Sequence, residues 1–200
     1  MITTVPLRER KKAATKERLY LEAIELFRHK GVTGTTIDDI AAAAEVSKGT
    51  FFNYFPTKES ILHYFGEQQS MGVAADLTEA LQDTKLDMRQ KLRLLFRALA
   101  KNIEADREVT RVVVFEVMKS PTELAREPYR ALFRQTVAAL VAEGQVRGEV
   151  RPGFNPDLAG SALTGVYFQQ IFEWCAADKP FPLAKRLDQM LDLIWEGLTP

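Results

Sequence analysis

The feature that most constrains the fold is a pair of short helical segments on either side of a tight turn. Apolar residues at helical spacing cover about eight residues from Ile37 to Ala44, and Ser47 then caps a second segment, Lys48–Tyr54, that Pro56 stops. Helices shorter than roughly 12 residues are marginal on their own in water. The pair therefore predicts a helix-turn-helix that packs on longer neighbouring helices.

Longer helical patterns flank this pair and provide those neighbours. Residues 15–30 place apolar side chains at helical spacing and end with cations followed by glycine, which is typical of a helix C-terminus. A second pattern begins at Thr57, a capping residue. Thr36 and Asp39 form a capping-box arrangement, with Asp in place of the usual Glu or Gln, at the start of the first short helix.

The rest of the chain is also helical in pattern. The run Val112–Val114 suits a strand as well, but a helix is preferred because no partner strand is evident elsewhere. Glycine and proline gather in residues 145–156 and predict a loop there. Helical spacing continues over residues 92–103, 109–117, 129–140, 157–175 and 187–198.

These patterns predict an all-α protein of about nine helices. An N-terminal three-helix head that holds the helix-turn-helix occupies residues 1–60, and a larger helical core occupies residues 61–200. A chain of 200 residues with 46% hydrophobic and 27% charged residues has the composition of an ordinary globular protein.

Composition argues against most enzyme and metal classes. One cysteine and two histidines, far apart in sequence, leave little material for a metal site, and the phosphate-binding and nucleophile-elbow motifs are absent. Cys175 with His29 or His63 could imitate a catalytic pair, but a small core cysteine and a helix-end cation are the preferred interpretations. We expect no enzyme activity, no cofactor and no metal. We also expect a cytoplasmic protein, since no long apolar run or signal-peptide core occurs.

Charge is balanced overall but unevenly distributed. The chain has 27 basic and 27 acidic residues, whereas residues 1–18 have a net charge of +4. One interpretation is a solvated, disordered tail. The other is a basic arm, Arg8–Lys12, that adds phosphate or minor-groove contacts to DNA.

The second short helix has a surface that suits DNA. Phe51 and Phe55, four residues apart, are expected in the core, whereas Lys48, Asn53 and Tyr54 are outward and polar or aromatic, as a helix in the major groove requires. Packing of the whole aromatic run in the core is the alternative, but a helix this short cannot bury every ring.

This stretch resembles the DNA-binding domain of TetR-type transcriptional regulators. The resemblance covers residues 12–62 and rests on TTIDDIA from Thr35 and on VSKGTFFNYFPTK from Val46. It implies an Ω-shaped homodimer in which the helical core binds a small inducer. Phe52 departs from the tyrosine usual in the family, whose hydroxyl often touches phosphate. The DNA-contacting positions implied are Thr36, Ser47, Lys48, Gly49, Thr50, Phe52, Asn53, Tyr54 and Lys58.

The helix predicted over residues 157–175 is apolar on more than one face, so it needs two packing partners. The protein's own core is one, and a second subunit, met together with the last helix, is the other. A single large monomer core is the alternative. The expected dimer interface consists of Leu163, Val166, Gln170, Trp174, Leu187, Leu191 and Ile194.

Bulky apolar residues on the core helices predict an apolar pocket for a hydrophobic or aromatic effector, with Tyr167 and Gln170 as polar anchors. The function expected is repression of a near-palindromic operator, relieved by that effector. Control by a protein partner, or by no effector, is the alternative. The expected effector contacts are Phe96, Leu99, Ile103, Val113, Val117, Met118, Phe133, Val137, Tyr167, Phe168 and Phe172.

Overall fold

The computed structural model describes residues 6–119 and 128–198, which form nine helices and no strand. The all-α prediction is therefore confirmed, including the helix at Val112–Val114. The chain divides into two compact units, Met1–Phe65 and Gly66–Pro200, and the division falls within helix α4. The sequence placed this boundary at residue 60.

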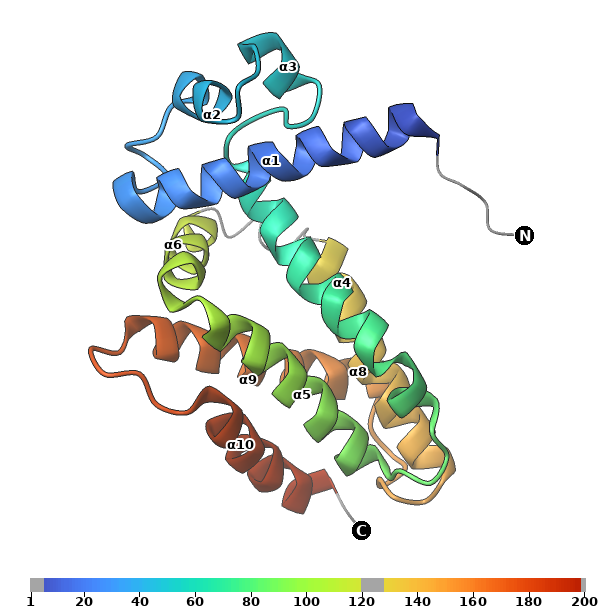
Figure 1. The fold of residues 1–200 in the computed structure, drawn as a ribbon. Helices are drawn as coiled ribbons and strands as arrows, with labels where there is room; N and C mark the ends of the chain where they lie inside the picture. The colour runs from blue at the N-terminus through green and yellow to red at the C-terminus, as the bar shows by residue number, and fades with distance from the viewer. Residues whose placement is uncertain (1–5, 120–127, 199–200) are drawn as a thin grey trace. The chain divides into compact units, whose positions relative to one another are not determined.

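The first unit contains α1 (Leu7–Lys30), α2 (Ile37–Ala43), α3 (Lys48–Phe52) and the start of α4 (Ser60–Gln82) (Figure 1). Helix α1 begins eight residues before the predicted start, so Arg8–Lys12 is helical and not a disordered tail, and its contacts with DNA stay a prediction. The reason is local, because the charged and alanine residues from Arg8 onward have high helix propensity.

Capping fixes both short helices as predicted. The Asp39 amide donates to Thr36 Oγ1 (3.1 Å), and the Thr36 amide donates to Asp39 Oδ2 (2.9 Å), which closes the capping box. The bond from the Thr36 backbone lowers the pKa of Asp39. At α3 the Thr50 amide donates to Ser47 Oγ (3.1 Å). Helix α3 ends two residues before the predicted Tyr54.

The turn between α2 and α3 is a Schellman arrangement. The Val46 amide donates to the Ala41 carbonyl (2.9 Å), the Glu45 amide donates to the Ala42 carbonyl (3.1 Å), and Glu45 adopts φ 53°. Below the turn, Phe51 and Phe55 are buried, as expected, together with Ile40 and Ala44, while Val46 is half-buried. This turn sets the direction of α3.

The second unit contains α5 (Met88–Ala105), α6 (Arg107–Met118), α8 (Pro128–Val146), α9 (Pro156–Ala176) and α10 (Leu183–Leu198). Helix α9 packs against α8, α10 and α6, and α5 packs against α8 and α10 (Figure 1). Gly160 permits the close approach of α9 to α8, because a Cβ there would lie 2.9 Å from Ala138 Cβ. Buried side chains of these helices form one core.

Most residues of the expected dimer interface are already buried within one protomer. The face of α9 that holds Leu163, Tyr167 and Trp174 packs on helices of its own protomer, whereas Leu158, Ala162 and Gly165 lie on an exposed face. Val166 and Ile194 are half-buried. The five other expected interface residues are 1–6% exposed within one protomer and lie in its core or against it: Leu163, Gln170, Trp174, Leu187 and Leu191.

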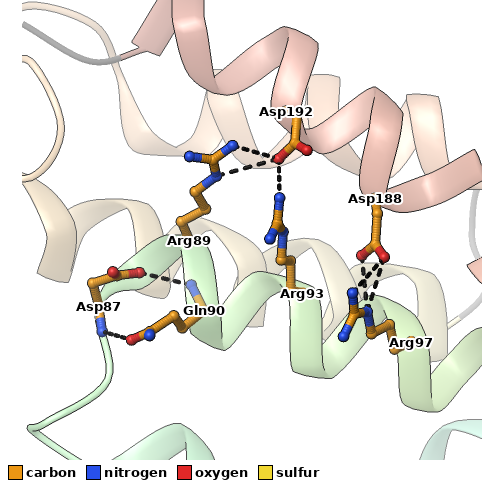
Figure 2. A network of polar contacts seen from close by, with 7 residues as sticks. All are labelled: Asp87, Arg89, Gln90, Arg93, Arg97, Asp188 and Asp192. Atoms are coloured by element: carbon orange, nitrogen blue, oxygen red, sulfur yellow. Dashed lines mark hydrogen bonds and ion pairs between the residues drawn. The ribbon is translucent and has the colours of Figure 1, made fainter. Parts of the chain in front are cut away.

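An arginine row on α5 meets two aspartates on α10 (Figure 2). Arg89 Nη2 lies 2.6 Å from Asp192 Oδ1, and Arg93 also donates to that oxygen. Arg97 donates hydrogen bonds to Asp188 from both Nε and Nη2, and Nη2 lies 2.7 Å from Oδ2. The arginines on α5 and the aspartates on α10 each recur every four residues, so each set lies on one side of its helix and faces the other set. The row therefore sets the register of α5 against α10.

The Asp192 carboxylate should make stability depend on pH. Hydrogen bonds from Arg89 and then Arg93 hold its pKa below the ordinary value. A depressed pKa contributes stability that is present above the unfolded-state pKa, about 3.9, and is lost as pH falls through the folded-state value. We expect Asp192→Asn to cost about 1 kcal/mol at pH 7, since the carboxylate is partly exposed.

Urea denaturation at pH 7 and at a pH of about 3 or below checks this. The deficit of Asp192→Asn should shrink in acid, while Glu196→Gln, exposed on the same helix, should show none at either pH. A deficit that is equal at both pH values contradicts the charge-based explanation.

Candidate nucleic-acid interface and effector core

One face of α3 is exposed, and its four residues differ in chemistry. Lys48, Gly49, Phe52 and Asn53 share this face at spacings of one, four and five residues, and all are exposed. Phe51, between them in sequence, is fully buried. The face thus offers a cation, a position without a side chain, an aromatic ring and an amide, and it carries no acidic group.

The cation of this face is paired in the free protein. Lys48 Nζ lies 2.8 Å from Asp38 Oδ2, and both side chains are exposed. Such a surface pair is worth about 0–1 kcal/mol, so the ammonium can exchange a carboxylate for a phosphate at little cost. Thr36 is exposed and Thr50 half-buried, and the hydroxyls of both are held by their caps.

Lys58 is placed differently from the other predicted DNA contacts. Its Nζ donates to the Val32 carbonyl (2.7 Å) and to the Thr35 carbonyl (2.8 Å), and the side chain is half-buried. These bonds fasten the segment between α1 and α2 to the start of α4. Sequence reasoning missed this role because nothing local links positions more than 20 residues apart.

We expect Lys58→Met to destabilise the first unit by about 2 kcal/mol, because two charge-assisted hydrogen bonds are lost while the stem is kept. Hydrogen exchange of the α2–α3 amides in the full chain measures this. DNA affinity should fall without a change in its salt dependence. Lys48→Met should instead reduce the slope of log affinity against log salt by about 0.9 per head. A reduced slope for Lys58→Met would make Lys58 a phosphate contact.

In the second unit, four predicted effector residues form a ring cluster. The Phe133 ring centroid lies 4.9 Å from that of Tyr167 and 5.9 Å from that of Phe96. The Phe168 centroid lies 5.1 Å from that of Tyr167. These rings come from α5, α8 and α9, so this cluster, Phe96–Phe133–Tyr167–Phe168, joins three helices.

The other predicted effector residues are scattered around this cluster. Phe172 pairs instead with Phe115 (5.8 Å between centroids), a residue that the sequence reasoning missed although it lies on the helix of Val113 and Val117. Met118 is exposed at the end of α6. Leu99, Ile103, Val113 and Val137 are buried, and Val117 is half-buried.

Two buried polar atoms on α9 have no hydrogen-bond partner among the described residues. They are Thr164 Oγ1 and Gln170 Oε1, and both side chains are 6% exposed. Tyr167 lies between them at spacings of three, on the buried side of the helix. The sequence predicted Gln170 as a polar contact of the effector. It missed Thr164, although this polar residue lies one helical turn before Tyr167 and could have been identified from that spacing. A buried polar atom without a bonded partner is costly, so a water or a ligand that supplies the missing bond would stabilise this core.

The thiol of Cys175 is fully buried, and burial raises its pKa to about 11. It stays protonated at neutral pH, which fits the expectation of a core residue. In the part of the chain that the structure describes, no three acidic, histidine or cysteine side chains gather where they could hold a metal, and no helix is long and apolar enough to cross a membrane.

Comparison with known proteins agrees with these two units. The family model for bacterial regulatory proteins of the tetR family matches residues 19–65, and that for the C-terminal domain of TetR/AcrR family transcriptional repressors matches residues 71–197. The transcriptional repressor DhaR of Mycobacterium sp. (strain GP1) is 29% identical, with 92% of each chain covered.

Two further relatives are regulators connected with fatty acids. The crystal structure of Thermus thermophilus FadR, a TetR-family repressor in complex with lauroyl-CoA, is 32% identical over 92% of this chain and 95% of that one, with a TM-score of 0.76. The fatty acid metabolism regulator of Bacillus subtilis is 24% identical over 88% of this chain and 91% of its own. The matched models span most of the sequence, and the chain belongs to the TetR family of bacterial transcriptional regulators.

Proposed function

We propose that this protein is a homodimeric repressor that an acyl-CoA thioester releases from its operator. The observation that carries the DNA-binding half is the exposed face of α3, which combines Lys48, Phe52 and Asn53 with a rigidly capped start. The effector half is supported by the ring cluster and by the likeness to a repressor crystallised with lauroyl-CoA. Such a regulator works in the cytoplasm, where its operator is.

In this proposal α3 enters the major groove. Phosphate contacts position the protein and supply most of the affinity, and base-edge contacts supply sequence choice. Lys58 acts through the backbone that it holds. The proposed contacts on this surface are Thr36, Ser47, Lys48, Gly49, Thr50, Phe52, Asn53 and Tyr54.

The dimer we propose uses the outer faces of α9 and α10. Leu158, Ala162 and Gly165 recur at helical spacing on α9 and are exposed, as is Leu193 on α10. A Cβ at Gly165 would meet nothing within 4 Å, so a second helix can approach there. A twofold dimer sets its heads on successive major grooves about 34–36 Å apart, on a near-palindromic site. Gly165→Arg should yield monomers in sedimentation.

The acyl chain is proposed to pack against the ring cluster, while Thr164 and Gln170 bond polar atoms near the thioester. When the effector binds, Thr164 Oγ1 and Gln170 Oε1 would gain hydrogen-bond partners, which favours the liganded state of the core. Release follows if that state holds the two heads at a spacing that does not fit successive grooves. The effector acts only through its differential affinity for the two states.

The test is a gel shift of the full-length protein on DNA selected from random sequence, titrated with lauroyl-CoA. Lauric acid and free coenzyme A serve as matched controls, because each carries half of the thioester. Release by lauroyl-CoA alone supports the proposal. A specific complex that ignores acyl-CoAs overturns the effector half and leaves control by a protein partner. Absence of any specific complex overturns the DNA-binding half.

A further inference from the structure

We infer that Phe52 reads DNA sequence through an apolar contact, in which its ring packs against the C5 methyl group of a thymine in each operator half-site. The inference rests on the proposed function, because it assigns a base to one residue of the α3 face. Cytosine and the purines present no such methyl group in the major groove, so the contact discriminates between bases without a hydrogen bond.

Exposure singles out Phe52. Its side chain is 48% exposed on a helix whose neighbouring ring, Phe51, is completely buried. On a face whose other side chains are a cation and an amide, this ring offers the apolar surface that a partner could cover. Phe51 and Phe55 are both buried beneath α3 and contact each other, so the core already takes two rings from this short segment while Phe52 stays outside it.

The ring is also held in place. It stands edge-on to Phe51, with ring centroids 5.6 Å apart and an interplanar angle of 88°. This contact fixes one side of the ring and leaves the other for a partner. Ordering a side chain that is already anchored costs less entropy than ordering a free one, which favours a specific contact.

The surroundings allow close approach to a base. Gly49 lies one turn before Phe52, and a Cβ there would meet only Ser47 Oγ, at 3.8 Å. Gly49 has no side chain that could cover the exposed ring, and the exposed Lys48 and Asn53 share this face with it. The lysine can hold a phosphate and the amide a base edge, and neither competes for an apolar methyl group.

A phosphate is the wrong partner for this side chain. The ring carries no donor, and burying it against an anionic oxygen would strip water from the phosphate without replacing the lost hydrogen bond. A methyl group on a flat base edge is instead apolar. Its burial is worth roughly fourfold in affinity per half-site and about fifteenfold when both half-sites lose it.

The experiment replaces thymine by deoxyuridine, which removes only the methyl group. An operator selected from random DNA with the full-length protein is resynthesised with each thymine changed in turn, symmetrically in both half-sites. We expect one position at which wild-type affinity falls about fifteenfold. Phe52→Ala should bind the thymine and deoxyuridine operators equally, and Phe52→Leu should keep part of the difference.

Lys48→Ala is the matched control from the same face. It should bind more weakly yet keep the full thymine preference, because its contact is with phosphate. Unperturbed hydrogen exchange in α2 and α3 shows that Phe52→Ala remains folded. The inference is overturned if wild type ignores every deoxyuridine, or if Phe52→Ala loses the same affinity as wild type at each position. Failure to select any specific operator overturns the proposed function as well, and is recognised before deoxyuridine is introduced.

Discussion

Truncation of Phe51 to alanine is expected to destabilise the first unit by about 3–5 kcal/mol and to abolish operator binding. The side chain is completely buried and contacts the rings of Phe52 and Phe55 (5.6 and 6.0 Å between centroids). A unit of this size has a total stability of about 3–10 kcal/mol. The loss therefore unfolds a large fraction of the molecules at the helix-turn-helix.

Hydrogen exchange of the α2 and α3 amides in the full chain measures the effect, together with a gel shift. Phe52→Ala is the control, since it removes the same ring from the adjacent, exposed position and should change stability by less than about 1 kcal/mol. If the two variants were equally stable, Phe51 would not be the ring that holds α3 in place.

The second large effect is expected at the buried Lys91. This lysine is 1% exposed, and its Nζ lies 2.7 Å from Glu143 Oε1, whose side chain is 39% exposed. The hydrogen bond from Lys91 is also the largest reason that the pKa of Glu143 is lowered. Glu143→Leu leaves a buried ammonium without its counter-ion. We expect a loss of about 3 kcal/mol, the low end for such pairs, because water reaches the carboxylate side.

Removing the cation instead should be nearly neutral. Lys91→Met keeps the buried stem, and Glu143 retains Arg147 at 3.2 Å, so we expect a change within about 1 kcal/mol. The double variant Lys91→Met/Glu143→Leu should recover most of what Glu143→Leu loses. Urea denaturation at pH 7 of the three variants gives the comparison. A double variant as unstable as Glu143→Leu alone would show that packing, and not the unpaired charge, causes the loss.

Features decided by residues close in sequence could be predicted. Thr36 and Ser47 cap their helices because a side-chain oxygen and a backbone amide three residues on are brought together by the helix start itself. The exposure of Lys48 and Asn53 follows from periodicity, whereas Tyr54, also expected to point outward, is half-buried. The start of α1 was missed because charged residues were interpreted as a tail, although their helix propensity is high.

Features that depend on distant segments could not be predicted in this way. The two apolar faces of α9 showed that two partners were needed, but not that α8, α10 and α6 of the same protomer would pack against one of these faces. The same limit applies to Lys58, which follows the helix-turn-helix in sequence, whereas the two backbone carbonyls that it bonds precede it. No pattern in the side chains marks a carbonyl as an acceptor.

The ion pair between Asp38 and Lys48 bears on how long the protein stays at the wrong DNA sequence. To contact a phosphate, Lys48 must first break its 2.8 Å ion pair with Asp38. A contact with an arbitrary phosphate therefore gains little binding free energy. The carboxylate left behind also faces the DNA backbone with a like charge. If Lys48 contacts phosphate as proposed, both effects would shorten each visit to a non-operator site, and a larger share of the search time would go to sampling new positions.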